Sequence, residues 1–293
     1  MRSNNVLGFI FAATLDDKIP ELASSRTTAS VPIGGKYRII DFDLSNMSNS
    51  GISNVGIVAK SNFQSLMDHV GSGSAYDLSK RRSNLSILPP YDGKAFSSFV
   101  ETIYNMHGYI EHCREEYVLI SQGNVITNID YTDVFDFHSK KKADITLIYK
   151  NHAIPQGYDR PITLDVDNDG KVNQIFVKPG VVDKGVFNHA YGSILIKKDL
   201  LMSEIRNAIS VNQLDVRRLI QSSLGKYSIY AYENKGYCAA ISSINDYFEF
   251  NMDLMKKEVR DELFNPQRPI YTKVRDDAPS RYGLTSNVKN SII

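Results

Sequence analysis

The chain has 293 residues, enough for one large α/β domain or for one domain and part of another. Lysine and arginine number 34 against 33 aspartates and glutamates, so the formal net charge at pH 7 is +1. A chain this close to neutral has no long-range field for holding nucleic acid or an anionic membrane surface. We therefore expect small molecules or other proteins as its partners.

The two cysteines, Cys113 and Cys238, form no C-x-x-C pair, so neither a disulfide framework nor a zinc–thiolate site is indicated. This usage fits a cytoplasmic protein. The apolar run Val6–Ala13 is too short to span a bilayer, and we interpret it as a buried strand.

Continuous apolar runs are typical of strands that are covered on both faces. Such runs lie at Val6–Phe11, Val55–Ala59, Tyr117–Ser121 and Ile145–Tyr149. Stretches with helical spacing lie between or beside them, at Phe42–Met47, Phe63–Val70, Phe99–Cys113 and Tyr131–His138. The alternation predicts βαβ units and a doubly wound, mostly parallel sheet.

The second half of the chain has a different pattern. Two strand-like pieces within Ile162–Val177 flank a turn in which we expect Asn168 and Gly170 to be left-handed, which predicts an antiparallel hairpin. Helical patterns and short strands follow, and the main domain is expected to end near Leu263. The helical patterns lie at Lys198–Ile209, Leu214–Leu224 and Ile244–Lys257, with strands near Ser228 and Ala239.

The histidines of the predicted helix Phe99–Cys113 could be imagined as metal ligands together with Cys113. A spacing of five residues between His107 and His112 predicts different helix faces, so we interpret them as ordinary helix positions. The sequence also contains no G-x-S-x-G nucleophile elbow.

A glycine pair at Gly34 and Gly35 is followed by two cations, Lys36 and Arg38. Glycines allow the backbone to approach a ligand closely, and the cations would suit an anion. Taken alone, the pattern fits either a phosphate site or a tight turn before a helix.

Residues 31–42, V-P-I-G-G-K-Y-R-I-I-D-F, closely resemble the signature of ADP-glucose pyrophosphorylases, the glucose-1-phosphate adenylyltransferases of glycogen and starch synthesis. Further matches follow in the same order along the chain, at 65–69, 71–73, 130–131, 178–179, 247–254 and 269–272. The resemblance implies an α/β, Rossmann-like nucleotidyltransferase domain with a mixed, mostly parallel sheet over residues 1–263. It also implies a linker over 264–293 that ends in the first coil of a truncated left-handed β-helix.

Catalytic members of this family join glucose 1-phosphate to ATP with magnesium held by two aspartates. The resemblance places these aspartates at Asn124, whose amide binds magnesium far more weakly, and at Ala240, which offers no ligand atom. The glutamate that precedes the family's substrate lysine becomes Val177, whereas Lys178 keeps the lysine as a candidate ligand of glucose 1-phosphate.

The family's glycine-rich loop is also degenerate here. Its positions fall on Ala13, Thr14, Asp16 and Lys18, and a later family lysine becomes Thr28. Side chains and a carboxylate in that loop would obstruct and repel a triphosphate.

These substitutions resemble those of the D-type regulatory subunit. The resemblance implies a non-catalytic chain without a cofactor of its own, with a catalytic homologue as partner in a hetero-oligomer that is expected to be a tetramer. Lys36, with Arg38 nearby, aligns with the family's activator site, and sugar phosphates or nucleotides are expected ligands. The alternative is an active adenylyltransferase that uses relocated carboxylates, for instance Asp16, Asp17 or Asp246.

Overall fold

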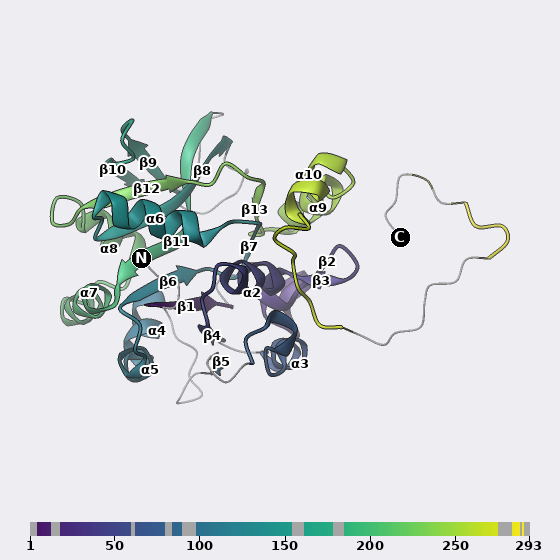
Figure 1. Cartoon of the computed structure of the whole chain (residues 1–293), viewed down its shortest axis with the longest axis horizontal. Helices are drawn as coiled ribbons and strands as arrows, with labels where there is room; N and C mark the ends of the chain where they lie inside the picture. The colour runs from purple at the N-terminus through teal and green to yellow at the C-terminus, as the bar shows by residue number, and fades with distance from the viewer. Residues whose placement is uncertain are drawn as a thin grey trace.

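The computed structural model describes residues 5–12, 18–59, 62–79, 84–89, 98–153, 161–177, 185–274, 283–287 and 289. A nine-stranded mixed sheet forms its centre, and helices cover both faces (Figure 1). The Rossmann-like α/β class is therefore confirmed.

The middle of the sheet is parallel. Strand β1 (Val6–Phe11) is buried along its whole length and pairs in parallel with β4 (Asn54–Val58) on one side and β6 (Tyr117–Ser121) on the other. Strand β5 (Asn84–Leu88) extends this part beyond β4. Apolar side chains on both faces of β1 explain this central place, because no face of the strand meets water.

The rest of the sheet is largely antiparallel and is organised by the long strand β11 (Val186–Lys197). It runs antiparallel to β6, to β8 (Ile145–Ala153) and to β9 (Ile162–Val166). Strand β12 (Ile229–Glu233) joins β8 in parallel, and β10 (Val172–Val177) closes the predicted hairpin with β9.

The hairpin turn lies where it was predicted, but its conformation differs from the predicted one. Only Gly170 is left-handed, with φ 85°, whereas Asn168 is not among the positive-φ residues described. The Asp167 carboxylate instead accepts hydrogen bonds from the amides of Asp169 and Lys171, both at 2.9 Å, so a side-chain acceptor shapes the turn.

Three buried clusters hold the helices in place. One sheet face packs on α4 (Phe99–Asn105), α5 (His107–His112), α7 (Lys198–Ser210) and α8 (Val216–Ser222). The opposite face packs on α2 (Ile39–Asn49), α3 (Gln64–Val70) and α6 (Tyr131–Lys141). A third cluster joins α2 to α1 (Pro20–Ala23), β2 (Pro32–Ile33), β3 (Tyr37–Arg38), α9 (Ile244–Asp253) and α10 (Lys257–Leu263). Smaller elements are β7 (Val125–Thr127), paired with β13 (Cys238–Ala240), and short 3-10 turns at Thr28–Ser30 and Ser74–Tyr76.

Two helices predicted as continuous are interrupted. The first breaks at Met106, where the His107 ring donates a hydrogen bond to the Tyr104 carbonyl at 2.6 Å and so competes with the helical ladder. His107 and His112, which were predicted to be ordinary positions on different helix faces, both line a cavity beside α5.

The second interruption lies between α9 and α10. There the Arg260 guanidinium donates to the carbonyls of Leu254 and Met255, both at 2.7 Å, and so satisfies the carbonyl end of α9. None of the helices in the described part of the chain is long and apolar enough to cross a membrane.

Residues 264–274, here called the strap, follow α10 and lie against the N-terminal half of the domain (Figure 1). The Arg268 guanidinium forms an ion pair with Asp130 at 2.6 Å and donates to the Ile129 carbonyl at 2.8 Å, and the Tyr271 amide donates to Ser45 Oγ at 2.8 Å. The predicted β-helix start lies mostly outside the described residues, and 283–287 and Lys289 form no strand or helix.

A buried carboxyl group lies on α2 beneath the sheet. Asp43 is 3% exposed and accepts a hydrogen bond from Ser121 Oγ at 2.5 Å, while its second oxygen has no partner among the described residues. Burial raises the pKa of Asp43 to about 7, and the Ser121 hydrogen bond offsets only part of this rise.

We predict that Asp43→Asn stabilises the protein above neutral pH. The folded state binds the Asp43 proton more tightly than the unfolded state does, so wild-type stability falls as pH rises from about 4 to about 7. The Asn variant should gain roughly 2–4 kcal/mol over wild type at about pH 8 and less than about 1 kcal/mol at about pH 4. Urea unfolding at both pH values measures this, and a difference that does not change with pH would contradict it.

Candidate functional site

The carboxyl ends of parallel strands β1 and β6 meet at one edge of the sheet, where ligands of open α/β sheets usually bind. Asn124, the first degenerate metal position, follows β6 at this edge and is only 2% exposed. The side-chain amide of Asn124 donates to the Ile241 backbone carbonyl at 3.1 Å. The backbone carbonyl of Asn124 accepts from the Ile241 amide at 2.9 Å. Asn124 therefore joins the segments after β6 and after β13.

This contact depends on the amide being neutral. A carboxylate only accepts hydrogen bonds, so an aspartate at position 124 would face the Ile241 carbonyl with two acceptors. Asn124 Oδ1 is buried and has no hydrogen-bond partner among the described residues, which leaves one uncharged oxygen.

Ala240, the second degenerate metal position, ends β13 and is buried in a small apolar cluster with Val125 and Tyr191. Tyr191 comes from a bulge in β11, where the register with β8 shifts and Gly192 has φ 84°. The side chains of Val125 and Tyr191 therefore pack against Ala240, the second expected metal position.

A pair of histidines holds the tyrosine at this bulge. The Tyr191 hydroxyl lies 2.5 Å from His152 Nε2, which in turn lies 3.3 Å from His189 Nδ1. Burial lowers the pKa of His152 to about 4 and that of His189 to about 3, with smaller contributions from Lys150 and from His152 respectively. Both rings are neutral at pH 7, so they provide no cation for a phosphate here.

Carboxylates that could replace the metal ligands were expected at Asp16, Asp17 or Asp246. Asp246 instead accepts hydrogen bonds from the Ser242 amide at 2.9 Å and the Ser242 hydroxyl at 2.5 Å, at the start of α9. Asp16 and Asp17 lie outside the described residues, as do Ala13, Thr14 and the substrate candidate Lys178.

The remaining degenerate positions that the structure describes lie on three other segments. Lys18 is exposed just before α1, Thr28 is buried in its 3-10 turn, and Val177 ends β10. In the described part of the chain no three histidine, cysteine or acidic side chains gather as a metal group. Asn124 and Ala240 together offer one neutral oxygen, which does not fit the carboxylate pair that magnesium requires in the catalytic relatives.

A second, cationic pocket of about 710 Å³ lies between the β2–β3 hairpin and the strap. Both effector candidates, Lys36 and Arg38, line it, together with Arg26 and Lys273, and none of the lining residues that the structure describes is a carboxylate. The Arg38 guanidinium donates to the carbonyl and hydroxyl oxygens of Ser65, both at 2.7 Å, which fixes its position. This set of cations suits a ligand with more than one phosphate.

Two of these four cations were not identified as effector residues from the sequence. Arg26 lies between α1 and the 3-10 turn at Thr28–Ser30. Lys273 follows the matching stretch 269–272, but no local pattern places it beside Lys36, because the strap brings it there by packing.

The chain matches the nucleotidyl transferase family over residues 17–257 and belongs to that family. It is 35% identical to the glycogen biosynthesis protein GlgD of Geobacillus stearothermophilus, over 99% of this chain and 76% of the relative. Two proteins of Bacillus subtilis are each 29% identical to it: GlgD, over 100% of this chain and 76% of the relative, and glucose-1-phosphate adenylyltransferase, over 98% and 77%. The resemblance to the glucose-1-phosphate adenylyltransferase family is thus confirmed.

A solved structure gives the same fold. A glucose-1-phosphate thymidylyltransferase from Bacillus anthracis, described as putative and crystallised with sucrose, superposes with a TM-score of 0.70. The match covers 89% of this chain and 98% of that one at 13% identity, so it supports the fold alone.

We predict that Asn124→Asp weakens the fold instead of creating a metal site. The new carboxylate would lose the hydrogen bond to Ile241 and remain buried, at a cost of roughly 2–4 kcal/mol in unfolding free energy. Urea unfolding with and without magnesium measures this. Asn245→Asp, on the exposed side of α9, is the matched control and should change stability by less than about 1 kcal/mol. An Asn124→Asp protein that magnesium stabilises above wild type would contradict the prediction.

Proposed function

We propose that this chain is a non-catalytic, regulatory subunit that supports ADP-glucose formation for glycogen biosynthesis in the cytoplasm. Its partner would be a catalytic glucose-1-phosphate adenylyltransferase subunit in a hetero-oligomer, in which the partner alone holds magnesium. Bacillus subtilis has relatives of this chain under both names, GlgD and glucose-1-phosphate adenylyltransferase, which supports a pairing of two homologous subunits.

The observation that carries the proposal is the state of the two metal positions. Asn124 uses its amide to bind Ile241, and Ala240 is buried against Tyr191. Removing one well-placed electrostatic group typically costs ~10² to 10³ in rate, and two losses acting on one magnesium triphosphate would leave little activity.

The cationic pocket supports a regulatory role of a specific kind. We infer that it binds an anionic effector such as a sugar bisphosphate, because four cations and no carboxylate occur among its described lining residues. The strap forms one wall of the pocket and also bonds to Ile129 and Asp130, which follow β7. An effector held there would stabilise the strap together with the segment that carries Asn124.

ADP-glucose synthesis should be measured for this chain alone, for a catalytic homologue alone and for the two mixed, with and without fructose bisphosphate. We expect this chain alone to show less than about 1% of the homologue's rate, and the mixture to exceed the homologue severalfold. Robust synthesis by this chain alone would instead establish the alternative, an active adenylyltransferase. An unchanged rate in the mixture, with no complex in size-exclusion chromatography, would remove the regulatory role.

The cations of the effector pocket can be tested by substitution. Lys36→Ala combined with Lys273→Ala should weaken binding of fructose bisphosphate by about tenfold, because two of the four cations are removed. Calorimetric titration measures the affinity, and Lys226→Ala, an exposed lysine outside the pocket, is the matched control. Equal affinity in the double variant and the control would place the effector elsewhere.

A further inference from the structure

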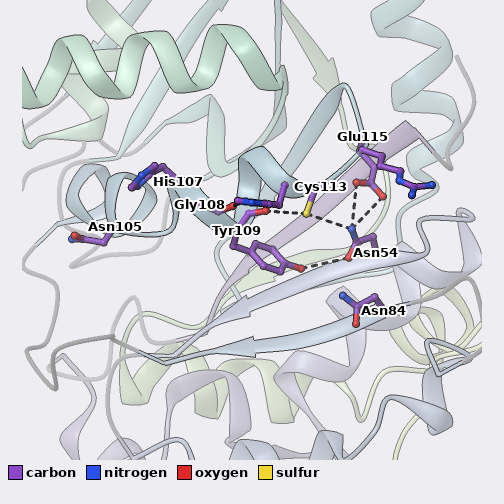
Figure 2. Close-up of a pocket in the computed structure, with 10 residues that line it drawn as sticks. Asn54, Asn84, Asn105, His107, Gly108, Tyr109, Cys113 and Glu115 are labelled. Carbon is purple, nitrogen blue, oxygen red and sulfur yellow. Dashed lines mark hydrogen bonds between the residues drawn. The ribbon is translucent and has the colours of Figure 1, made fainter.

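A cavity of about 780 Å³ opens at the amino ends of β4 and β5, beside α5 (Figure 2). Asn54 begins β4 and Asn84 begins β5, while Cys113 and Glu115 lie between α5 and β6. This edge of the sheet is opposite the edge that carries Asn124. The cavity is therefore separate from both sites described above, and its volume is in the range of small-molecule pockets.

Hydrogen bonds connect several of the side chains that line the cavity. Asn54 Nδ2 donates to Glu115 Oε1 at 3.2 Å and to Cys113 Sγ at 3.6 Å, and Asn54 Oδ1 accepts from the Tyr109 hydroxyl at 3.4 Å (Figure 2). The Cys113 thiol donates to the Tyr109 carbonyl at 3.2 Å. A ligand would meet polar groups that are already oriented, which reduces the entropy lost on binding.

Most of the described lining residues have polar side chains. Burial raises the pKa of Tyr109 to about 12, so its phenol remains a neutral hydrogen-bond donor. Among the described lining residues, Arg114 and Glu115 carry opposite formal charges. This part of the lining offers an anion one guanidinium, whereas four cations line the pocket around Lys36.

A metal ion is also a poor match for the cavity. His107 and His112 each direct Nδ1 to a backbone carbonyl, those of Tyr104 and Gly108. Within the described ranges no three histidine, cysteine or acidic residues gather in a metal-binding group. The described lining offers amides, a carboxylate, imidazoles and a phenol ring. These groups include both hydrogen-bond donors and acceptors, and vicinal hydroxyl groups need both.

We propose that this cavity binds a neutral polyhydroxylated ligand, a free sugar or the end of a short glucan, between α5 and the amino ends of β4 and β5. The three asparagines, Asn54, Asn84 and Asn105, and Glu115 would pair with hydroxyl groups, and the half-buried Tyr109 ring would contact the apolar face of the sugar. This binding is independent of the regulatory role proposed above.

Gly108 permits a test that leaves the polar network intact. It lines the cavity, its backbone is not left-handed, and a Cβ added there would meet no heavy atom within 4 Å. Gly108→Phe should therefore fill the space, whereas Gly108→Ala is the matched control with the same backbone restriction and almost no added volume.

The experiment is a calorimetric or NMR titration of the full chain with glucose, maltotriose and glucose 6-phosphate. We expect a dissociation constant on the order of 1 mM for glucose or maltotriose, unchanged in Gly108→Ala and weakened at least about tenfold in Gly108→Phe. Tighter binding of maltotriose than of glucose would assign the site to a glucan end, and equal binding would assign it to a free sugar.

Three outcomes would overturn the proposal. These are no saturable binding of either neutral sugar, binding that Gly108→Phe does not change, or glucose 6-phosphate binding more tightly than glucose with the same loss in Gly108→Phe. The circular dichroism spectra of both variants show whether they fold. If Gly108→Phe does not fold, Asn84→Ala, at an exposed position, replaces it with the same expected loss. Because the titration uses this chain without a partner, its result does not depend on the regulatory assay.

Discussion

The parallel pairing of β1 with β4 and β6 is the constraint on which the remaining structure depends. A strand paired on both sides and covered on both faces cannot shift without exposing apolar side chains, so it fixes the direction of its neighbours. All carboxyl ends of these strands then meet at one edge and all amino ends at the other. The degenerate metal positions lie at the first edge and the cavity beside α5 lies at the second.

At the carboxyl edge, the two expected metal positions and the candidate replacement carboxylate Asp246 all make internal contacts. Asn124 links two chain segments, Ala240 packs on Tyr191, and Asp246 orders the start of α9. Each contact conflicts with magnesium binding for a different reason. Asn124 donates through a neutral amide, Ala240 packs in an apolar cluster, and the Asp246 carboxylate already accepts hydrogen bonds. The departure from the catalytic pattern is therefore built into the packing of this edge as well as into its residue types.

The cationic pocket and the strap show how distant segments act together. Tyr37, beside Lys36 and Arg38, stacks on Phe264 at a centroid distance of 4.9 Å, so the hairpin also contacts the beginning of the strap. Farther along, Arg268 bonds to Ile129 and Asp130. The proposed effector pocket is thus connected through ordered contacts to the segment that follows Asn124, which gives a physical basis for a regulatory response.

The sequence by itself determined the strands β1, β4 and β6 and the hairpin of β9 and β10, because continuous apolar runs and turn residues are local patterns. It also determined the family, because the 31–42 signature is a contiguous motif. It also identified Asn124 and Ala240 as positions without carboxylates. Only the tertiary structure decided what these residues do, since Ile241 follows β13 and Tyr191 belongs to β11, and packing brings each to its partner. The place of Lys273 beside Lys36 and the cavity beside α5 likewise depend on contacts between distant segments, which leave no periodic pattern in the sequence. The breaks at Met106 and after Asp253 instead accompany hydrogen bonds from the side chains of His107 and Arg260 to nearby carbonyls.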